Sequence, residues 1–165
     1  MIFSHPPEHL STSHNVASFD CGVPELDSWL KERALQNEAS RASRTFVVIS
    51  EGRVVGYYAL ATGAVAHSSA TGKVRRNMPE PIPVMTLARL AVDKAAQGSG
   101  LGSALLRDAM LRILQVAEDV GVRAVLLHAV SEDAKRFYAH HGFKESPIDP
   151  MTMMIALSDL EKALR

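Results

Sequence analysis

The segment that most constrains the fold is an apolar strand followed by a glycine-rich turn and a long helical pattern. The apolar strand covers residues 84–92, the turn at 97–103 reads QGSGLGS, and the helical pattern covers 102–120. Glycines let another group approach the main chain closely, and the N–H groups and dipole of a helix start attract anions. We therefore expect a strand, loop and helix unit with a site for a pyrophosphate, although such a turn is often purely structural.

Two common phosphate-binding motifs do not fit this turn. A nucleoside triphosphate loop ends in Gly-Lys-Ser/Thr, whereas Gly102-Ser103-Ala104 has no lysine. A dinucleotide fingerprint lies in the first βα unit and is followed by an acidic residue at the end of the next strand, but that strand ends here in Val130-Ser131. The turn therefore matches neither of these two classes of phosphate site.

The N-terminal half predicts a helix and a β-hairpin. Pro24 and two early acidic residues favour a helix that begins there, with an apolar stripe of Leu26, Trp29, Leu30 and Ala34. The β-rich runs 45–49 and 54–60 flank Glu51-Gly52, which is typical of a hairpin. Residues 61–83 are rich in glycine, serine and proline and are expected to form a long, functional connection.

The C-terminal half continues the alternation of strands and helices. Gly121 is expected to end the long helix, and 122–130 forms a buried strand. Ser131 caps a short helix that ends near His141-Gly142, and 151–155 forms a final strand. Ser158 to Glu161 resembles a capping box for a last helix. The order of elements predicts a mixed α/β class.

Composition narrows the class of protein further. With 165 residues and 47% apolar side chains, we expect a single domain over 1–165. The single cysteine, Cys21, excludes an intrachain disulfide and suits a reducing compartment. No apolar run approaches the length of a membrane span, and the first ten residues do not resemble a signal peptide. We expect a soluble cytoplasmic protein that does not enter a membrane.

Two motifs in the right order resemble the GNAT acetyltransferase superfamily. Gln-x-x-Gly-x-Gly after Leu-Ala-Arg-Leu-Ala-Val-Asp resembles its coenzyme A loop, and the segment 134–143 (AKRFYAHHGF) resembles its late Phe-Tyr-x-x-x-Gly-Phe segment. Residues 19–22, 26–30, 39–47 and 89–93 further resemble the toxin branch, whose members acetylate the α-amine of aminoacyl-tRNA. The resemblance implies a GNAT acyltransferase fold, an α/β fold with a central mixed, twisted sheet whose strands splay and are flanked by helices.

The resemblance also implies roles for individual residues. The main chain of Leu90, Ala91 and Val92 would pair with the pantetheine of acetyl-CoA. The pyrophosphate would lie on the N–H groups of the loop, and Tyr138 would face the thioester sulfur as the acid that protonates the leaving thiolate. Phe137 completes the cofactor site, and Ser131 replaces an asparagine that touches pantetheine in many relatives. The implied loop contacts are Gln97, Gly98, Ser99, Gly100, Leu101, Gly102 and Ser103.

The sequence offers no clear general base. Lysine amines, with a reference pKa of about 10.4, need a base at neutral pH, whereas an α-amine titrates at about 7.7 to 8.0 and a neighbouring ester lowers that pKa further. The missing base therefore favours an aminoacyl acceptor weakly, and Glu80 stays open as an unrecognised base.

Positive charge is concentrated in the middle of a chain that is neutral overall, with 18 basic and 18 acidic residues. Segment 31–76 holds eight basic and three acidic side chains, which is typical of a phosphate-backbone site but also of a solvated surface. The candidates for contact with tRNA are Lys31, Arg33, Arg44, Arg75 and Arg76. Arg89, inside an apolar strand, is expected to form a buried hydrogen-bonded pair.

Two other residue types are assigned to packing or to no role. Cys21 has no basic partner nearby in sequence and is expected to pack rather than react. The adjacent His140 and His141 diverge on a helix, so we expect no metal site.

Three functions stay open at this point. The first is a toxin N-acetyltransferase that blocks translation, acts as a homodimer, and is neutralised by a ribbon-helix-helix antitoxin. The second is a GNAT enzyme that acetylates a small amine, a drug or a protein N-terminus. The third is a non-catalytic regulator that binds acyl-CoA.

Overall fold

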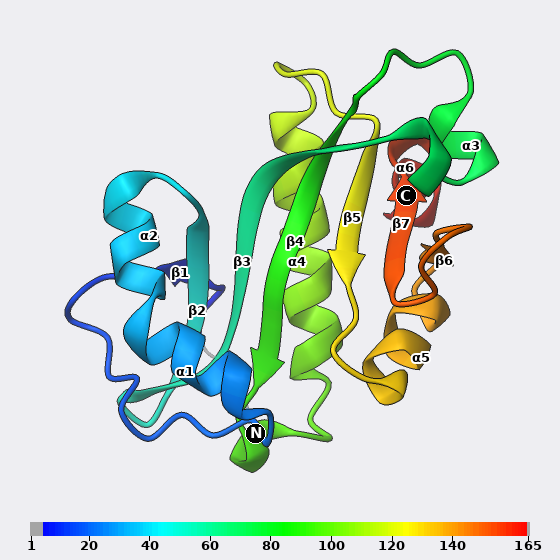
Figure 1. Cartoon of the computed structure of the whole chain (residues 1–165). Helices are drawn as coiled ribbons and strands as arrows, with labels where there is room; N and C mark the ends of the chain where they lie inside the picture. The colour runs from blue at the N-terminus through cyan, green and yellow to red at the C-terminus, as the bar shows by residue number, and fades with distance from the viewer. Residues whose placement is uncertain (1–4, 165) are drawn as a thin grey trace. The chain divides into compact units, whose positions relative to one another are not determined.

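The computed structural model describes residues 5–164 (Figure 1). The expectation that the first ten residues are not a signal peptide concerns in part residues 1–4, which lie outside the described residues. Seven strands form one mixed sheet in the order β1-β2-β3-β4-β5-β7-β6. Helices accompany the sheet, which confirms the expected mixed α/β class. The chain divides into two compact units, and β3, β4 and α4 run through both. The expectation of one domain over 1–165 stays a prediction.

Unit 1 comprises the chain up to Ala61 and Ala88–Ala109. It holds β1 (Glu8–His9), α1 (Pro24–Glu32), α2 (Ala34–Ser40), β2 (Arg44–Ser50) and most of β3 (Arg53–Val65). Strand β2 pairs antiparallel with β3, as the hairpin pattern predicted, and also pairs antiparallel with β1, which was not predicted. Apolar side chains of α1 and of β2 and β3 form its core, with Phe19, Leu30, Val47 and Tyr57 at most 1% exposed.

The remainder of unit 1 is the strand, loop and helix segment. It contains the end of β4 (Ile82–Val92), the 3-10 turn η2 (Lys94–Ala96) and the start of α4 (Leu101–Val116). The expected helix over 102–120 ends four residues early, because Ala117 to Val120 form a turn whose N–H groups bond carbonyls three or four residues back.

Unit 2 comprises Thr62–Leu87 and the chain from Met110 onward. It contains β5 (Ala124–His128), α5 (Glu132–His140), β6 (Lys144–Glu145), β7 (Thr152–Ala156) and α6 (Leu157–Leu164). Strand β5 pairs parallel with β4 over Val84–Thr86 and antiparallel with β7, which also pairs with β6 (Figure 1). The strand expected at 122–130 is therefore shorter than its apolar run.

Three expectations about element boundaries were wrong. The first helix is broken at Arg33 into α1 and α2. Segment 61–83 is not one loop, because β3 continues to Val65 and the turn η1 (His67–Ser69) and helix α3 (Gly72–Arg75) follow; its apolar side chains Val65, Ala70 and Val74 belong to the core of unit 2. Helix α6 begins at Leu157 rather than after Ser158, since Leu157 is itself buried and its N–H bonds the carbonyl of Arg123.

Candidate functional site

A buried carboxylate holds the chain between β4 and α4. Asp93 is 4% exposed and accepts hydrogen bonds from both terminal nitrogens of Arg53, at 3.0 and 3.3 Å. It also accepts the main-chain N–H groups of Asp20 and Ala95, both at 2.9 Å. Burial raises the pKa of Asp93, but Arg53 and the two N–H groups outweigh it and lower the pKa to about 2. Asp93 is therefore an ionised structural anchor for the loop.

The side chain of Gln97 forms a second anchor. Its amide nitrogen donates to the carbonyls of Cys21 and Val92, each at 2.9 Å, and its main-chain N–H donates to Lys94 at 3.4 Å. The Gln97 side chain therefore joins the last carbonyl of β4 to the turn before α1. A role of its N–H in binding pyrophosphate stays a prediction.

The glycines after Gln97 leave the main chain accessible. Gly98 and Gly100 have φ values of +80° and +86°, which favour glycine, and a Cβ placed on either would meet nothing within 4 Å. Both are exposed, as is Ser99, whose hydroxyl donates to the carbonyl of Ala96. The space over the loop is thus open to a ligand.

Helix α4 begins directly after this turn. Its first residues are Leu101, Gly102 and Ser103, and the N–H of Ala104 bonds the carbonyl of Gly100 at 3.1 Å. The N–H groups of a first helical turn have no carbonyl four residues earlier to bond, and the helix dipole adds positive potential there. The segment predicted to bind pyrophosphate therefore has the chemistry of an anion site.

A close approach of β3 fixes where α4 starts. A Cβ on Gly56 would lie 2.9 Å from Leu101 Cδ2 and 3.0 Å from Leu105 Cδ1. Both leucines are buried. The absence of a side chain at Gly56 lets the first two turns of α4 pack directly on the strand, and this packing positions the loop.

The main chain predicted to pair with pantetheine lies at the end of β4. Ala91 is buried in the core of unit 1, and Leu90 and Val92 are half-buried. Arg89 differs from the expectation of a buried polar pair: its guanidinium bonds the carbonyl of Ala88 at 2.7 Å and lies 5.1 Å from the centre of the Trp29 ring. The aromatic face of Trp29 takes the place of a buried counter-ion.

In unit 2, Tyr138 occupies the buried side of α5. It is 7% exposed, and its ring meets Phe137 and Phe143 edge-on, with centroids 5.1 and 5.8 Å away. Burial raises the pKa of Tyr138. Among the described residues of its own unit, 62–87 and 110–164, none hydrogen-bonds its hydroxyl. Tyr138 is held as a neutral phenol whose proton is not committed to a structural bond.

The other two tyrosines of the chain differ from Tyr138 in this respect. Tyr57 donates to the carbonyl of Leu26 at 2.7 Å, and Tyr58 donates to Asp108 at 2.5 Å. Both are fully buried. The two structural tyrosines each have a fixed acceptor, whereas Tyr138 has none among the described residues of its unit, and this difference supports a chemical role for Tyr138.

Helix α5 is fixed by the residue that caps its N-terminus and by its aromatic side chains. Ser131 Oγ accepts the N–H of Ala134 at 3.1 Å, which confirms the predicted cap. The Ser131 hydroxyl therefore serves as the N-cap of α5. Phe137 is half-buried and stacks edge-on with both Tyr138 and His141.

The basic candidates lie in both units. Lys31, Arg33 and Arg44 are exposed in unit 1, where Arg44 forms an ion pair of 2.8 Å with Glu38. Arg75 and Arg76 are exposed in unit 2, and Arg75 also donates to the carbonyl of Ala70 at 3.1 Å. The structure does not assemble these five cations within one unit.

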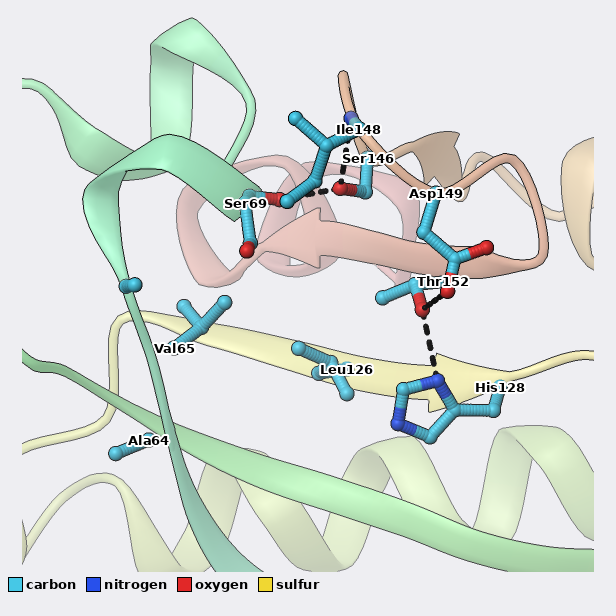
Figure 2. A pocket seen from close by; sticks show the side chains of 10 residues that line it. Ala64, Val65, Ser69, Leu126, His128, Ser146, Ile148, Asp149 and Thr152 are labelled. Carbon is cyan, nitrogen blue, oxygen red and sulfur yellow. Dashed lines mark hydrogen bonds between the residues drawn. The ribbon is translucent and has the colours of Figure 1, made fainter.

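A pocket in unit 2 contains residues that the sequence reasoning missed. It has a volume of about 310 Å³ and is lined by the end of β3, by β5 and by the turn between β6 and β7 (Figure 2). His128, Thr152 and Asp149 form a hydrogen-bonded row on its wall. The only signal in the sequence was a histidine that ends a buried apolar strand.

Glu80, which stayed open as a base, is engaged elsewhere. Its carboxylate oxygens each accept the main-chain N–H of His67 at 3.2 Å, and one lies 3.5 Å from His67 Nδ1. These bonds fix the turn that precedes α3. Glu80 is a structural residue of that turn.

Cys21 packs in the core of unit 1, as expected. Burial raises the pKa of its thiol to about 11, so it stays protonated. Over residues 5–164, no three His, Cys, Asp or Glu side chains gather as a metal site would require. Nor is any helix in that range long and apolar enough to span a bilayer.

Comparison with known proteins is consistent with this geometry. The family described as the acetyltransferase (GNAT) domain matches residues 41–145. The tRNA-acetylating toxin of Mycobacterium tuberculosis (strain ATCC 25618 / H37Rv) is 52% identical over 153 residues, covering 93% of this chain and 92% of the relative. The probable toxin TacT of Sinorhizobium fredii (strain NBRC 101917 / NGR234) is 26% identical, covering 92% and 90%.

Solved structures of similar proteins share the fold. A tyrosine-to-phenylalanine variant of KacT has a TM-score of 0.88 at 25% identity, covering 94% of this chain and 96% of that one. AtaT complexed with acetyl-methionyl-tRNAfMet has a TM-score of 0.87 at 24% identity, covering 96% and 98%. An AtaT variant bound to the C-terminus of the antitoxin AtaR has a TM-score of 0.82 at 25% identity, covering 94% and 93%. The chain belongs to the GNAT acetyltransferase family, and within it to the branch of toxins.

Proposed function

We propose that this chain is a toxin that transfers the acetyl group of acetyl-CoA to the α-amine of aminoacyl-tRNA and so blocks translation. The observation that carries the proposal is the 52% identity to a tRNA-acetylating toxin over 93% of the chain. At that level of identity and coverage, a shared substrate class is the simplest account.

The glycine loop fits the proposed co-substrate. Acetyl-CoA supplies a thioester, whose attack by an amine releases a thiolate. The main chain of Gly98 to Ser103 suits its pyrophosphate, because a Cβ on Gly98 or Gly100 would meet nothing within 4 Å and the start of α4 favours negative charge. Leu90, Ala91, Val92, Gln97 and Phe137 stay assigned to the rest of the cofactor site.

Tyr138 is proposed as the catalytic acid. Its burial keeps the phenol protonated, and among residues 62–87 and 110–164 its hydroxyl has no acceptor that would hold the proton back. A phenol positioned at the departing sulfur donates its proton as the thiolate forms and regains it from solvent afterwards. The packing of its ring against Phe137 and Phe143 fixes the direction of the hydroxyl.

The acceptor end is proposed to be recognised by exposed cations. Lys31, Arg33, Arg44, Arg75 and Arg76 are all exposed, and arginine and lysine side chains bind the phosphates of a nucleic acid. We further place the protein in the cytoplasm, where charged tRNA occurs, as a homodimer neutralised by a ribbon-helix-helix antitoxin. The antitoxin-bound neighbour supports an antitoxin partner, since that AtaT variant binds the C-terminus of AtaR.

The decisive experiment is to incubate the purified protein with acetyl-CoA and a pool of charged tRNA and to analyse the tRNA 3′ ends by mass spectrometry. We expect a gain of one acetyl group on the aminoacyl-adenosine, together with release of coenzyme A. If the protein acetylates small amines or protein N-termini but not aminoacyl-tRNA, it is an acetyltransferase of those amines and the proposal is wrong. Coenzyme A binding without any transfer would indicate a regulator.

A further inference from the structure

The pocket of unit 2, which we call the His128 pocket, combines an apolar floor with one polar wall. Its floor includes Val65 and Leu126, and its rim carries Ile148, whose side chain is 66% exposed although it is apolar. Figure 2 shows His128, Thr152 and Asp149 in a row along one side of the pocket. A volume of about 310 Å³ suits a small organic group.

The hydrogen bonds between His128, Thr152 and Asp149 can be assigned donors and acceptors in only one consistent way. Thr152 Oγ1 donates to Asp149 Oδ2 at 2.8 Å, and the same oxygen lies 2.8 Å from His128 Nδ1. A hydroxyl has a single proton, so once Thr152 donates to the carboxylate it must accept from His128. His128 therefore carries its proton on Nδ1, and Nε2, turned away from Thr152 in Figure 2, is left as a proton acceptor.

Asp149 is fixed as the negative end of this row. It accepts the Thr152 hydroxyl and the N–H of Met151, the latter at 3.0 Å, and the Thr152 bond is the main cause of its lowered pKa. Thr152 is itself only 6% exposed, so water competes little for its hydroxyl. The carboxylate stays ionised at neutral pH and keeps the threonine oriented.

Few other charges bear on His128. Asp149 is the only other titratable group that lines the pocket. The neighbouring stretches of β4, 82–87, and β7, 152–156, contain no titratable side chain. On β6 and α5, Glu145 is paired with Lys135 at 2.6 Å, and Asp133 is paired with Arg136.

We infer that the His128 pocket receives the aminoacyl end of the acceptor and that His128 Nε2 is the general base that takes a proton from its ammonium group. The inference rests on the proposed function, because it names the acceptor subsite of that reaction. Thr152 and Asp149 are positioning residues. They set the tautomer and the orientation of the imidazole without touching the substrate.

The chemistry balances in protons and bonds. His128 Nε2 takes one proton from the α-ammonium, the freed nitrogen forms a bond to the acetyl carbon, and the carbon–sulfur bond breaks. Tyr138 gives its proton to the sulfur. The new amide nitrogen loses its second proton, and both residues return to their starting states with a net release of one proton to solvent.

The charge of the pocket selects for an amine. Its ionised group is a carboxylate, which attracts an ammonium and repels a phosphate, while Val65, Leu126 and Ile148 offer apolar contacts to an amino-acid side chain. Phosphates of a tRNA therefore bind elsewhere, and only the charged 3′ end enters. An aminoacyl ester satisfies both requirements.

The first test reads the tautomer directly and needs no acceptor. In ¹⁵N-histidine-labelled full-length protein, long-range imidazole spectra at pH 8 should show His128 with its proton on Nδ1. Thr152→Val should change that tautomer population, whereas Thr152→Ser should restore it. A proton on Nε2 in the wild type would overturn the inference, whatever the enzyme acetylates.

The second test is a pH series of acetylation rates on aminoacyl-tRNA. His128→Gln should lower kcat about 10-fold at pH 6.5, with unchanged KM for acetyl-CoA. The loss should shrink toward pH 9, because the α-amine then sheds its proton without help. His140→Gln, a change of an exposed histidine on α5, is the matched control and should leave the profile unchanged.

The outcomes separate this inference from the proposed function. Equal rates for His128→Gln and wild type at pH 6.5 would remove the base while leaving tRNA acetylation standing. If the wild type acetylates only amino acid methyl esters, the proposed function fails, and the same pH series on the esters still decides the role of His128. A loss that does not change with pH would also count against a base.

Discussion

The glycine loop of unit 1 and the His128 pocket of unit 2 present reactive groups in opposite ways. In the loop, the main chain is the part proposed to meet the ligand, and the side chains of Asp93 and Gln97 hold that main chain in place. In the pocket, side chains face the ligand, and the strands β5 and β7 hold them. A site made of main chain depends on glycine spacing, whereas a site made of side chains depends on contacts between distant segments.

This difference explains why the glycine loop could be predicted from the sequence and the His128 pocket could not. Gln97, Gly98 and Gly100 lie close together in the chain, so their pattern is visible in one line of letters. His128 and Thr152 are 24 residues apart and meet only because β5 and β7 pair at that register. No local pattern predicts that pairing.

The largest expected effect is a loss of turnover when the hydroxyl of Tyr138 is removed, compared with the loss of the hydroxyl of a structural tyrosine. Tyr138→Phe removes the proton donor but keeps the ring packing, so kcat should fall by about 10²- to 10⁴-fold with little change in melting temperature. Tyr57→Phe, the matched control, should lose about 1 kcal/mol of stability and keep kcat, since its hydroxyl bonds Leu26. Steady-state rates and thermal melts measure both; a fully active Tyr138→Phe would reduce Tyr138 to a packing residue.

The next effect tests the main-chain site. Gly100→Glu adds a side chain and a negative charge where the pyrophosphate is proposed to lie, and we expect acetyl-CoA affinity by calorimetry to fall about 100-fold or more. Gly52→Glu is the control, because Gly52 also has a positive φ of +77° and open space but lies in the β2–β3 turn. Similar affinities for the two variants would mean that backbone strain, rather than a lost anion site, explains any weakening.

The boundaries that sequence reasoning missed have physical causes. The stripe of Leu26, Leu30 and Ala34 continues smoothly, yet Arg33 interrupts the helix with φ at −119°. The prolines and serines of 61–83 indicated a loop, but burial of Val65 and Val74 organises that segment. In the second case tertiary packing decides the structure, and a local pattern does not report it.

A smaller effect concerns the anchor of the loop. Asp93→Asn should reduce stability at pH 7 by about 2 kcal/mol and weaken acetyl-CoA binding, because Arg53 and two N–H groups lose their charged acceptor. The pKa of Asp93 is lowered to about 2, so its contribution is complete above the unfolded value of about 3.9 and is lost as pH falls from 4 toward 2.

Urea titrations at pH 7 and pH 3 check this pH dependence. The difference in the free energy of unfolding between wild type and Asp93→Asn should be smaller at the lower pH. Asp133→Asn is the control: that carboxylate is 89% exposed in its pair with Arg136, and no measurable change is expected. A difference in unfolding free energy that is the same at both pH values would mean that Asp93 does not act through its charge.

The smallest expected effect concerns which of the two units binds the phosphates of tRNA. Each phosphate contact releases condensed counter-ions from the tRNA, so replacing Arg75 and Arg76 by alanine should flatten the slope of log affinity against log salt by about one unit per lost contact. Acetyl-CoA affinity should stay the same, because these exposed side chains lie outside the loop. The double variant Lys31→Ala, Arg33→Ala makes the same change in unit 1, so comparing the two slopes in filter-binding assays assigns the tRNA contacts to one unit, to both, or, if neither slope changes, to other residues.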